Sequence, residues 1–277
     1  MSELRSHLKS LERSNRAMTD PGRPVTFSMA NREWDLLDEV FAPVYSPSTG
    51  IALDFLGLAG PNGGPMPSSL LEIGCGAGVI AVQAALVGCA TVAVDVNERA
   101  VENTRLNAQR HGVADRVTAV HSDLFAALDD GTRFDRIFWS SNYVLAPEDY
   151  AYRSVHERAY VDPGYRTHRR YLAEAVHRLT DNGSALLHFC DRGDLRGLER
   201  IAAECGRELR VLRRSAVLEG QDLVEHILLE IRPLLDNTTQ RGDRSGSGGR
   251  PVVMEGRCGA RRTRVGAKPE KRRPARA

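Results

Sequence analysis

The sequence predicts an α/β protein built on a doubly wound, mostly parallel sheet. An apolar run, Leu70–Ile73, leads into three glycines at alternate positions and then into the helical pattern of residues 79–86. Short β-branched runs follow at residues 91–95 and 117–121, with a helical pattern between them. Strands and helices that alternate in this way pack as a parallel sheet with helices on both faces, and ligands bind at the carboxyl ends of the strands.

The segment that precedes this sheet is expected to form a helical lid. Residues 1–24 are polar and end in a Pro- and Gly-containing stretch, which predicts a flexible N-terminus and a folded part that starts near Val25. Apolar residues at helical spacing predict a helix over residues 33–41, with Trp34, Leu37, Val40 and Phe41 on one face. A loop with two prolines and a second helix at residues 51–58 follow, so that residues 25–66 would form an N-terminal lid or substrate segment.

The glycine turn, Gly74, Gly76 and Gly78, is expected to hold a cofactor. Glycine lets the backbone approach a ligand where any Cβ would collide. The helix at residues 79–86 would point its free backbone N–H groups into the same turn. Glycine-rich turns between a strand and a helix also occur in nicotinamide enzymes, so the turn alone does not identify the cofactor.

An acidic residue marks each of three successive strands: Glu72, Asp95 and Asp123. Asp95 follows the glycine turn by about 20 residues, the offset at which a carboxylate meets ribose hydroxyls. Three acids in this order suit a ligand with a cationic centre, a ribose and an amino-bearing adenine. The alternative is that they are ordinary caps at the ends of strands.

The rest of the sheet is predicted in chain order. Asn97 can cap a helix that runs to Arg110. Further patterns predict strands at residues 134–139 and 184–189, helices at residues 167–179 and 195–205, and a closing antiparallel pair at residues 209–212 and 223–231. The sheet domain would therefore span residues 67–235.

Three motifs, "LEIGCGAG", "VAVDVN" and "HSDLF", together resemble the class I, Rossmann-like S-adenosylmethionine-dependent methyltransferases. The pattern is most similar to the release-factor glutamine methyltransferase-like, or small methyltransferase-domain, branch, and it covers Tyr45 to Ile231. The resemblance implies seven strands in the order 3-2-1-4-5-7-6, S-adenosyl-L-methionine as cofactor, and a transferase activity. It also implies that Glu72 lines the methionine part, that Asp95 binds the ribose and that Asp123 approaches the adenine amino group.

The resemblance further implies a set of cofactor-binding residues. In "YSPSTG", a shortened version of the family's loop over the cofactor, Tyr45, Ser48 and Thr49 are candidate lid contacts, although a simple turn would explain them as well. Cys75 is expected to be a small buried side chain and not a nucleophile. The full set is Tyr45, Thr49, Glu72, Gly74, Cys75, Gly76, Gly78, Asp95, Val96, Asn97, Asp123, Leu124 and Ser140.

The acceptor pocket is expected after the fourth strand, at Ser140-Ser141-Asn142-Tyr143. Glutamine- and adenine-directed methyltransferases carry Asn-Pro-Pro-Tyr there. Tyr143 keeps the aromatic position, but the loss of both prolines removes the rigid turn, so an amide-nitrogen target is not secured. Catalytic candidates are therefore Ser140, Asn142 and Tyr143.

The polar segment at residues 146–166 follows, and its length is typical of a functional loop. If the acceptor needs a base, His156 and Glu157 are the candidates, with a solvated surface as the alternative. His188, in the fifth strand, is expected to be buried and hydrogen-bonded.

Composition excludes several classes. With 277 residues, 42% hydrophobic and 27% charged, the chain resembles an ordinary soluble protein. No run approaches the roughly 20 apolar residues of a membrane span, so a cytoplasmic protein without a membrane partner is expected. The five cysteines lack paired spacing, and no metal site is predicted.

Residues 236–277 are expected to form a disordered basic tail. Residues 237–277 contain twelve basic and three acidic residues, which gives them a net charge of +9 and leaves −7 for residues 1–236.

These observations favour a methyltransferase that acts on a nitrogen or oxygen of a small molecule, amino acid or peptide, in specialised metabolism for example. A protein-glutamine or RNA methyltransferase is the alternative, with the basic tail assisting, but the acidic body would repel phosphates. Nucleic acid is therefore not favoured as a partner. A non-catalytic scaffold that binds the cofactor stays open as a third class, and the oligomeric state is not predicted.

Overall fold

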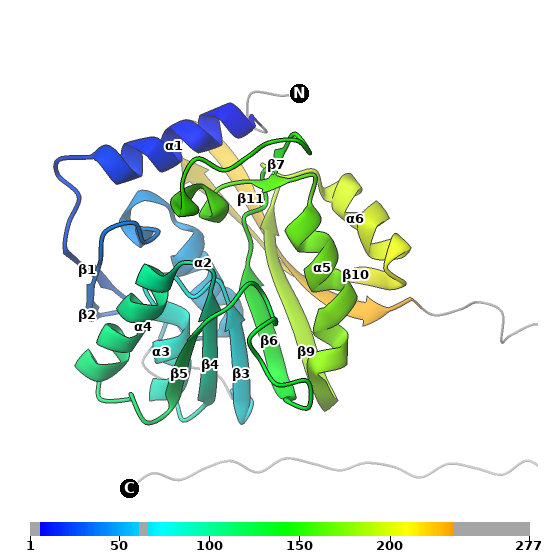
Figure 1. Ribbon diagram of the computed structural model, residues 1–277, viewed down its shortest axis with the longest axis horizontal. Helices are drawn as coiled ribbons and strands as arrows, with labels where there is room; N and C mark the ends of the chain where they lie inside the picture. Colours follow the sequence, from blue (N-terminus) through cyan, green and yellow to red (C-terminus); the bar gives the residue numbers. More distant parts are fainter. Residues whose placement is uncertain (1–5, 61–65, 235–277) are drawn as a thin grey trace, which may run out of the picture. The chain divides into compact units, whose positions relative to one another are not determined.

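A seven-stranded sheet forms the centre of the protein, seen here in a computed structural model that describes residues 6–60 and 66–234 (Figure 1). Its strands are β3 (Ser69–Ile73), β4 (Ala90–Asp95), β5 (Val117–His121), β6 (Phe134–Ser140), β9 (Leu179–Cys190), β10 (Arg207–Glu219) and β11 (Asp222–Pro233). From edge to edge the order is β10-β11-β9-β6-β3-β4-β5. Counted within this sheet alone and from the β5 edge, the order is 3-2-1-4-5-7-6.

The pairing is parallel from β5 to β9 and antiparallel where β11 joins β9 and β10. The doubly wound, mostly parallel sheet predicted from the sequence is therefore present. β9 and β10 extend further than the sequence patterns indicated, because polar residues continue both strands beyond their apolar stretches.

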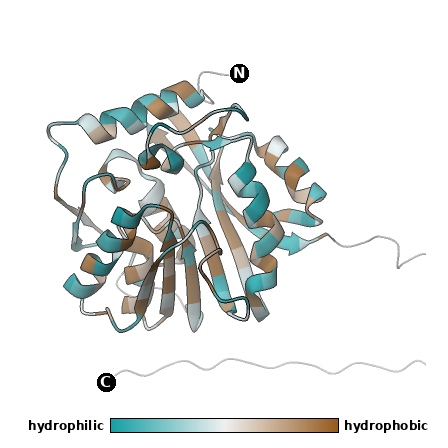
Figure 2. Cartoon of the chain, viewed as in Figure 1, coloured by the Kyte–Doolittle hydropathy of each residue, from teal (hydrophilic) through white to brown (hydrophobic). Residues whose placement is uncertain are grey.

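Helices cover both faces of the sheet (Figures 1 and 2). Because neighbouring strand residues point to opposite faces, Leu70 packs into one apolar core and Leu71 into the other. The Leu70 core includes residues of α2 (Ser48–Leu56), α3 (Val79–Leu86) and α4 (Glu98–Arg110). The Leu71 core includes residues of α5 (Arg166–Glu174), the 3-10 turn η4 (Ala175–Arg178) and α6 (Leu195–Glu204).

The N-terminal segment differs from the expectation. Residues 7–19, which we expected within a flexible N-terminus, form helix α1 (His7–Thr19), and the Ser6 side chain accepts a hydrogen bond from the Lys9 amide. The buried residues of this helix are Ser10, Ser14 and Ala17, which are small and mostly polar. Hydrophobic periodicity does not detect a face of this kind, because the helix is held by hydrogen bonds and close packing.

The prediction of a helix at residues 33–41 is wrong. The chain forms a hairpin of β1 (Thr26–Met29) and β2 (Arg32–Asp35), and Ala30 and Asn31 turn with positive φ angles of 50° and 58°. Phe27 faces Trp34 across the hairpin, and both rings are buried. The alternation of Trp34 and Leu36 follows a strand period, and it outweighs the helical spacing on which the prediction relied.

The other predictions for residues 25–66 agree with the structure only in part. The loop expected to be extended contains the 3-10 turn η2 (Pro43–Tyr45), and the second predicted helix is α2, which starts three residues early. The segment is thus a hairpin, a turn and a helix rather than a helical lid. Its expected boundary at residue 66 adjoins residues outside the described part of the chain.

The segment after β6 is folded rather than an open loop. It contains β7 (Leu145–Ala146) paired with β8 (Asp162–Pro163), and the 3-10 helix η3 (Val155–Ala159) between them. The expected basic tail, residues 236–277, lies outside the described residues. Within the described ranges, no helix is both long and apolar enough to cross a bilayer.

Candidate active site

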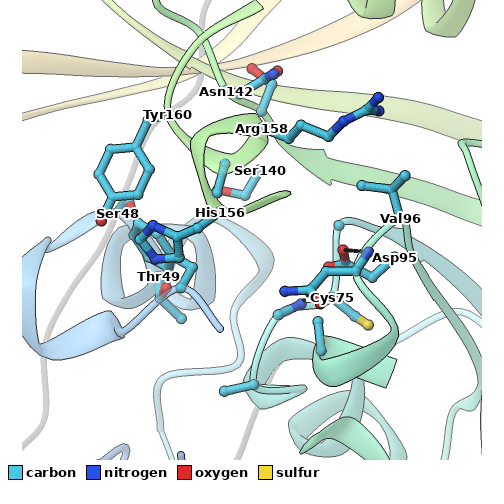
Figure 3. A pocket seen from close by; sticks show the side chains of 18 of the residues that line it. Ser48, Thr49, Cys75, Asp95, Val96, Ser140, Asn142, His156, Arg158 and Tyr160 are labelled. Atoms are coloured by element: carbon cyan, nitrogen blue, oxygen red, sulfur yellow. Dashed lines mark hydrogen bonds between the residues drawn. The ribbon is translucent and has the colours of Figure 1, made fainter. Parts of the chain in front are cut away.

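A cavity of about 420 Å³ lies at the carboxyl ends of β3, β4 and β6 (Figure 3). Its floor is the glycine turn with the ends of these strands. Its walls come from α1, η2, the start of α2 and η3. Segments that are more than a hundred residues apart in the chain therefore enclose one space. The volume falls within the range of small-molecule sites.

The glycines of the turn have different tasks. Gly74, Gly76 and Gly78 all have positive φ, at 69°, 53° and 78°. A Cβ on Gly76 would meet nothing within 4 Å, whereas a Cβ on Gly78 would lie 2.8 Å from Cα of Thr104. Gly74 and Gly76 line the cavity, but Gly78 is not among the residues of its wall. Gly78, expected to bind the cofactor, instead lets α3 pack against α4.

Glu72 and Asp95 both line the cavity, and both accept backbone hydrogen bonds. Glu72 accepts from the Ala81 amide at 2.9 Å, and burial raises the pKa of this carboxyl group well above its usual value. Asp95 accepts from the amides of Gly76 and Asn97 at 3.0 and 2.9 Å. Burial also raises the pKa of Asp95, and these hydrogen bonds oppose the rise.

The third acid, Asp123, is more exposed than the other two. Its two carboxylate oxygens accept hydrogen bonds from Nη1 of Arg170 at 3.0 and 2.9 Å. It lines the cavity beside Leu124, Val96 and Asn97. The contact with the adenine amino group stays a prediction, and the Arg170 ion pair would compete with it.

Cys75 behaves as the sequence suggested, as a small buried group. Its side chain is buried, and the Thr104 hydroxyl donates to its Sγ at 3.2 Å. Burial raises the pKa of the Cys75 thiol well above its usual value, which disfavours the reactive thiolate.

The residues of the "YSPSTG" loop are brought to the cavity. Tyr45, Ser48 and Thr49 all line it. The Tyr45 hydroxyl donates to Oδ2 of Asp20 at 2.7 Å, which ties this loop to the end of α1. The loop therefore closes one side of the cavity together with a helix that the sequence did not predict.

The expected acceptor residues Ser140 and Asn142 also lie in the cavity wall (Figure 3), and Tyr143 lines it as well. Asn142 donates from Nδ2 to the Val161 carbonyl at 2.8 Å, and among the described residues its buried Oδ1 has no hydrogen-bond partner. Burial raises the pKa of the Tyr143 hydroxyl well above its usual value, so this group stays protonated.

The two candidate bases differ in position. His156 is buried in the cavity wall, where its Nδ1 lies 2.8 Å from the Ser14 hydroxyl. Burial lowers the pKa of His156 to about 4, so its imidazole is neutral near pH 7 and a weak base. Glu157 is not in the wall: it accepts from the Tyr150 hydroxyl and the Arg153 amide. The structure therefore does not support Glu157 as a base.

Several wall residues were missed by the sequence analysis. They come from α1, from η3 and from the end of β10: Ser10, Arg13, Arg16, Asp20, Arg158, Tyr160 and Glu219. None belongs to a motif. The polar Ser10 and Ser14 at helical spacing in α1 are the one signal that could have pointed to a buried polar face.

The cavity fits a ligand with a cationic centre. The buried Glu72 and the half-buried Asp95 both line it, and the position of Gly76 leaves the backbone open to the ligand. Burial raises the pKa of both carboxyl groups because it disfavours their charged forms, and a positive ligand would relieve this cost. S-adenosylmethionine, which combines a sulfonium, a ribose and an adenine, meets these requirements.

Comparison with known families agrees with this geometry. Residues 70–160 match a family model described as a methyltransferase domain. This match spans β3 to η3 and therefore includes the glycine turn, the acids and the expected acceptor loop. This part of the chain is therefore similar to the domain of class I S-adenosylmethionine-dependent methyltransferases. S-adenosylmethionine is the methyl donor used by this class.

Relatives of the methyltransferase domain have varied acceptors in their names. A ribosomal protein L11 methyltransferase of Geobacter sp. (strain M21) is 35% identical over 103 residues, 34% of each chain. A probable cobalt-precorrin-6B C(15)-methyltransferase of Pyrobaculum calidifontis is 40% identical over 72 residues, 25% of this chain and 37% of that one. The chain thus spans about a third of the length of these curated relatives.

Among solved structures, the Mtq2–Trm112 complex of E. cuniculi, described as responsible for methylation of the eRF1 translation termination factor, is similar at 18% identity. The alignment covers 69% of this chain and 98% of that chain, with a TM-score of 0.49. This likeness does not bear on the acceptor.

Proposed function

We propose that this protein methylates a nitrogen or oxygen of a small-molecule, amino-acid or peptide acceptor, with S-adenosylmethionine as donor. The observation that carries the proposal is the single cavity, which joins the glycine turn and its acids to a second, polar end. The donor supplies an electrophilic methyl group on a sulfonium. The remaining task of the protein is to position the acceptor against it and to accept a proton.

The donor end is supported by the two acids. The Asp95 carboxylate, held by two backbone amides, is oriented to accept from ribose hydroxyls. The Glu72 carboxylate lies beside the turn, where its charge would favour a cationic ligand. Both groups are positioned before any ligand binds, which reduces the entropy cost of binding.

The acceptor end is supported by unpartnered polar atoms. Among the described residues, Oδ1 of Asn142, Nε of Arg13 and Nε2 of His156 are buried without a hydrogen-bond partner, and all three residues line the cavity. An unsatisfied buried polar group costs about 1–3 kcal/mol. A polar acceptor that presents both a donor and an oxygen would satisfy these atoms.

The enclosure of this end favours an acceptor that fits inside the cavity. Helix α1 contributes Ser10 and Arg13 to the wall, and η3 contributes His156. A free amino acid, a small metabolite or one side chain of a peptide would fit such a space. Methylation of a protein glutamine or of RNA is the alternative, and one relative is named for a protein acceptor, ribosomal protein L11.

Calorimetry with S-adenosylhomocysteine tests the donor site. The wild-type chain should bind it and should not bind NAD, and Asp95→Asn should weaken binding by about 1–3 kcal/mol because one acceptor oxygen is replaced by an NH2 group. Glu102→Gln, which changes an exposed ion pair on α4, is the matched control and should bind as the wild type does. Binding of NAD alone, or unchanged affinity in Asp95→Asn, would contradict the proposal.

A further inference from the structure

A continuous chain of buried polar side chains runs from the cavity into the sheet. It starts at Ser140, at the end of β6, whose Oγ lies 3.0 Å from Nδ1 of His188 on β9. Nε2 of His188 lies 2.9 Å from Nδ1 of His226 on β11. Nε2 of His226 lies 3.0 Å from Oε1 of Glu219, whose other oxygen pairs with Arg192 at 2.9 Å.

This chain is almost entirely removed from solvent. His188 and His226 are fully buried, and the side chains of Glu219 and Arg192 are 10% and 9% exposed. The edge of the Phe55 ring covers His188 at a centroid distance of 5.4 Å. Apolar residues at such sites are often equally or more stabilising than buried ionic groups, so fold stability alone does not account for the chain.

The donor and acceptor of every hydrogen bond in this chain follow from Arg192, at the end away from Ser140. Arg192 has only donors, and its guanidinium favours the ionised Glu219 carboxylate, which can only accept. His226 must then donate from Nε2, which leaves its Nδ1 as an acceptor. His188 must in turn donate from Nε2 and accept at Nδ1.

Ser140 stands at the start of this chain and lines the cavity. Because Nδ1 of His188 is an acceptor, the Ser140 hydroxyl must donate its proton to it. The lone pairs of Oγ are then left for the cavity. Burial lowers the pKa of His188 to about 3, in agreement with a neutral ring that can act as this acceptor.

We propose that Ser140, His188, His226 and Glu219 form a proton relay that serves the methyl acceptor. The inference rests on the proposed function. Ser140 Oγ accepts a hydrogen bond from the N–H or O–H of the acceptor, and this fixes the acceptor atom as one that carries a proton. Glu219, which lines both the cavity and a second hollow beside it, is the final proton acceptor.

The proton balance is complete within these residues. As the acceptor atom exchanges its proton for the methyl group, that proton moves to Oγ of Ser140, and the hydroxyl proton of Ser140 moves to Nδ1 of His188. The Nε2 proton of His188 moves to Nδ1 of His226, and the Nε2 proton of His226 moves to Glu219. Both rings end neutral, with the opposite nitrogen protonated, and Glu219 becomes a neutral acid that solvent can deprotonate.

The relay predicts a spectroscopic signature that does not need the acceptor. In the full chain labelled with 15N-histidine, long-range proton–nitrogen NMR spectra should show both His188 and His226 as neutral rings with the proton on Nε2. The signals that disappear in His188→Asn are assigned to His188, and those that disappear in His226→Asn are assigned to His226. A proton on Nδ1 of either ring, or a charged ring, near pH 7 would overturn the proposal.

Glu219→Gln provides the decisive variant, because Arg192 can only donate and therefore requires the amide oxygen. The amide NH2 then faces His226 and donates to Nε2, which should reverse the whole chain. We expect the protonated nitrogen to shift from Nε2 to Nδ1 in both histidines. Glu230→Gln, an acid of β11 paired with Arg232 outside this chain, is the matched control and should leave both tautomers unchanged.

The outcomes separate the relay from the proposed function. Unchanged tautomers in Glu219→Gln, or equal shifts in Glu230→Gln, would overturn the relay. Calorimetry with S-adenosylhomocysteine on the same samples tests the donor site independently. If binding is retained while the tautomers are wrong, the relay fails alone; if the tautomers are right while binding is absent, the proposed function fails.

Discussion

His156 shows how burial, assisted by the charge of Arg23, decides the protonation of a single side chain in this site. Its ring is 2% exposed, and its Nδ1 joins α1 through the Ser14 hydroxyl. Burial lowers the pKa of His156 to about 4 from the usual 6.5, so the folded protein resists its protonation. A residue chosen from the sequence as a candidate base is therefore better suited to accept or donate a hydrogen bond in neutral form.

This shift predicts a loss of stability in mild acid. The unfolded chain binds a proton at this histidine below about pH 6.5, whereas the folded chain does not until about pH 4. The contribution of His156 to the free energy of unfolding is thus full above pH 6.5 and is lost as the pH falls towards 4. Urea unfolding at several pH values should show a smaller acid dependence for His156→Gln than for the wild type. Equal changes of the free energy of unfolding with pH in the two proteins would contradict the lowered pKa of His156.

At the scale of elements, the junction of α3 and α4 depends on one glycine. Gly78 begins α3 with a left-handed conformation and lies against the backbone of Thr104 in α4, so no larger residue fits. Gly76, two residues earlier, has a similar conformation but faces open space. The same motif therefore contains one glycine required for packing and another whose open side leaves space for a ligand.

Two alanine substitutions separate these tasks. Gly78→Ala should lower the free energy of unfolding by about 2–4 kcal/mol, through left-handed strain and overpacking. Gly76→Ala should cost about 1–2 kcal/mol, from strain alone, and should weaken S-adenosylhomocysteine binding because its Cβ would enter the ligand space. Urea unfolding and calorimetry measure both. Similar unfolding costs for the two variants would contradict this division.

At the scale of the whole molecule, charge is divided between the body and the C-terminal residues. Residues 237–277 carry a net charge of +9 and residues 1–236 a net charge of −7. Among the described residues, those that line the cavity lie between Ser10 and Glu219. We therefore expect the site to form without the C-terminal segment, although a basic segment can attract nucleic acid.

Removal of residues 237–277 tests this division. The shortened chain should keep the urea midpoint and the S-adenosylhomocysteine affinity of the full chain, because the described residues that line the cavity and fill both cores all precede the deleted segment. Formation of S-adenosylhomocysteine with free amino acids as acceptors should also be unchanged. A loss of turnover confined to RNA or protein acceptors would instead favour the macromolecular alternative.

The central strands, the glycine turn and the acids could be predicted from the sequence, because each is a local pattern, whereas the spatial order of the strands was implied only by the resemblance to a family. Leu70–Ile73 reads as a strand from its own residues, and the position of Asp95 follows from its distance to the turn. The N-terminal segment could not be predicted in the same way. Helix α1 is held by the small buried residues Ser10 and Ser14, and the β1–β2 hairpin is held by a Phe27–Trp34 contact across a turn.

The sequence by itself predicted an α/β methyltransferase fold and a ligand site at the glycine turn. Only the tertiary structure decided which buried side chains connect to the cavity there. Ser140, His188 and His226 join into one chain because β6, β9 and β11 are neighbours in the sheet, although their residues lie far apart along the chain. Hydrogen bonds of this kind depend on distance in space, and no spacing in the sequence encodes it.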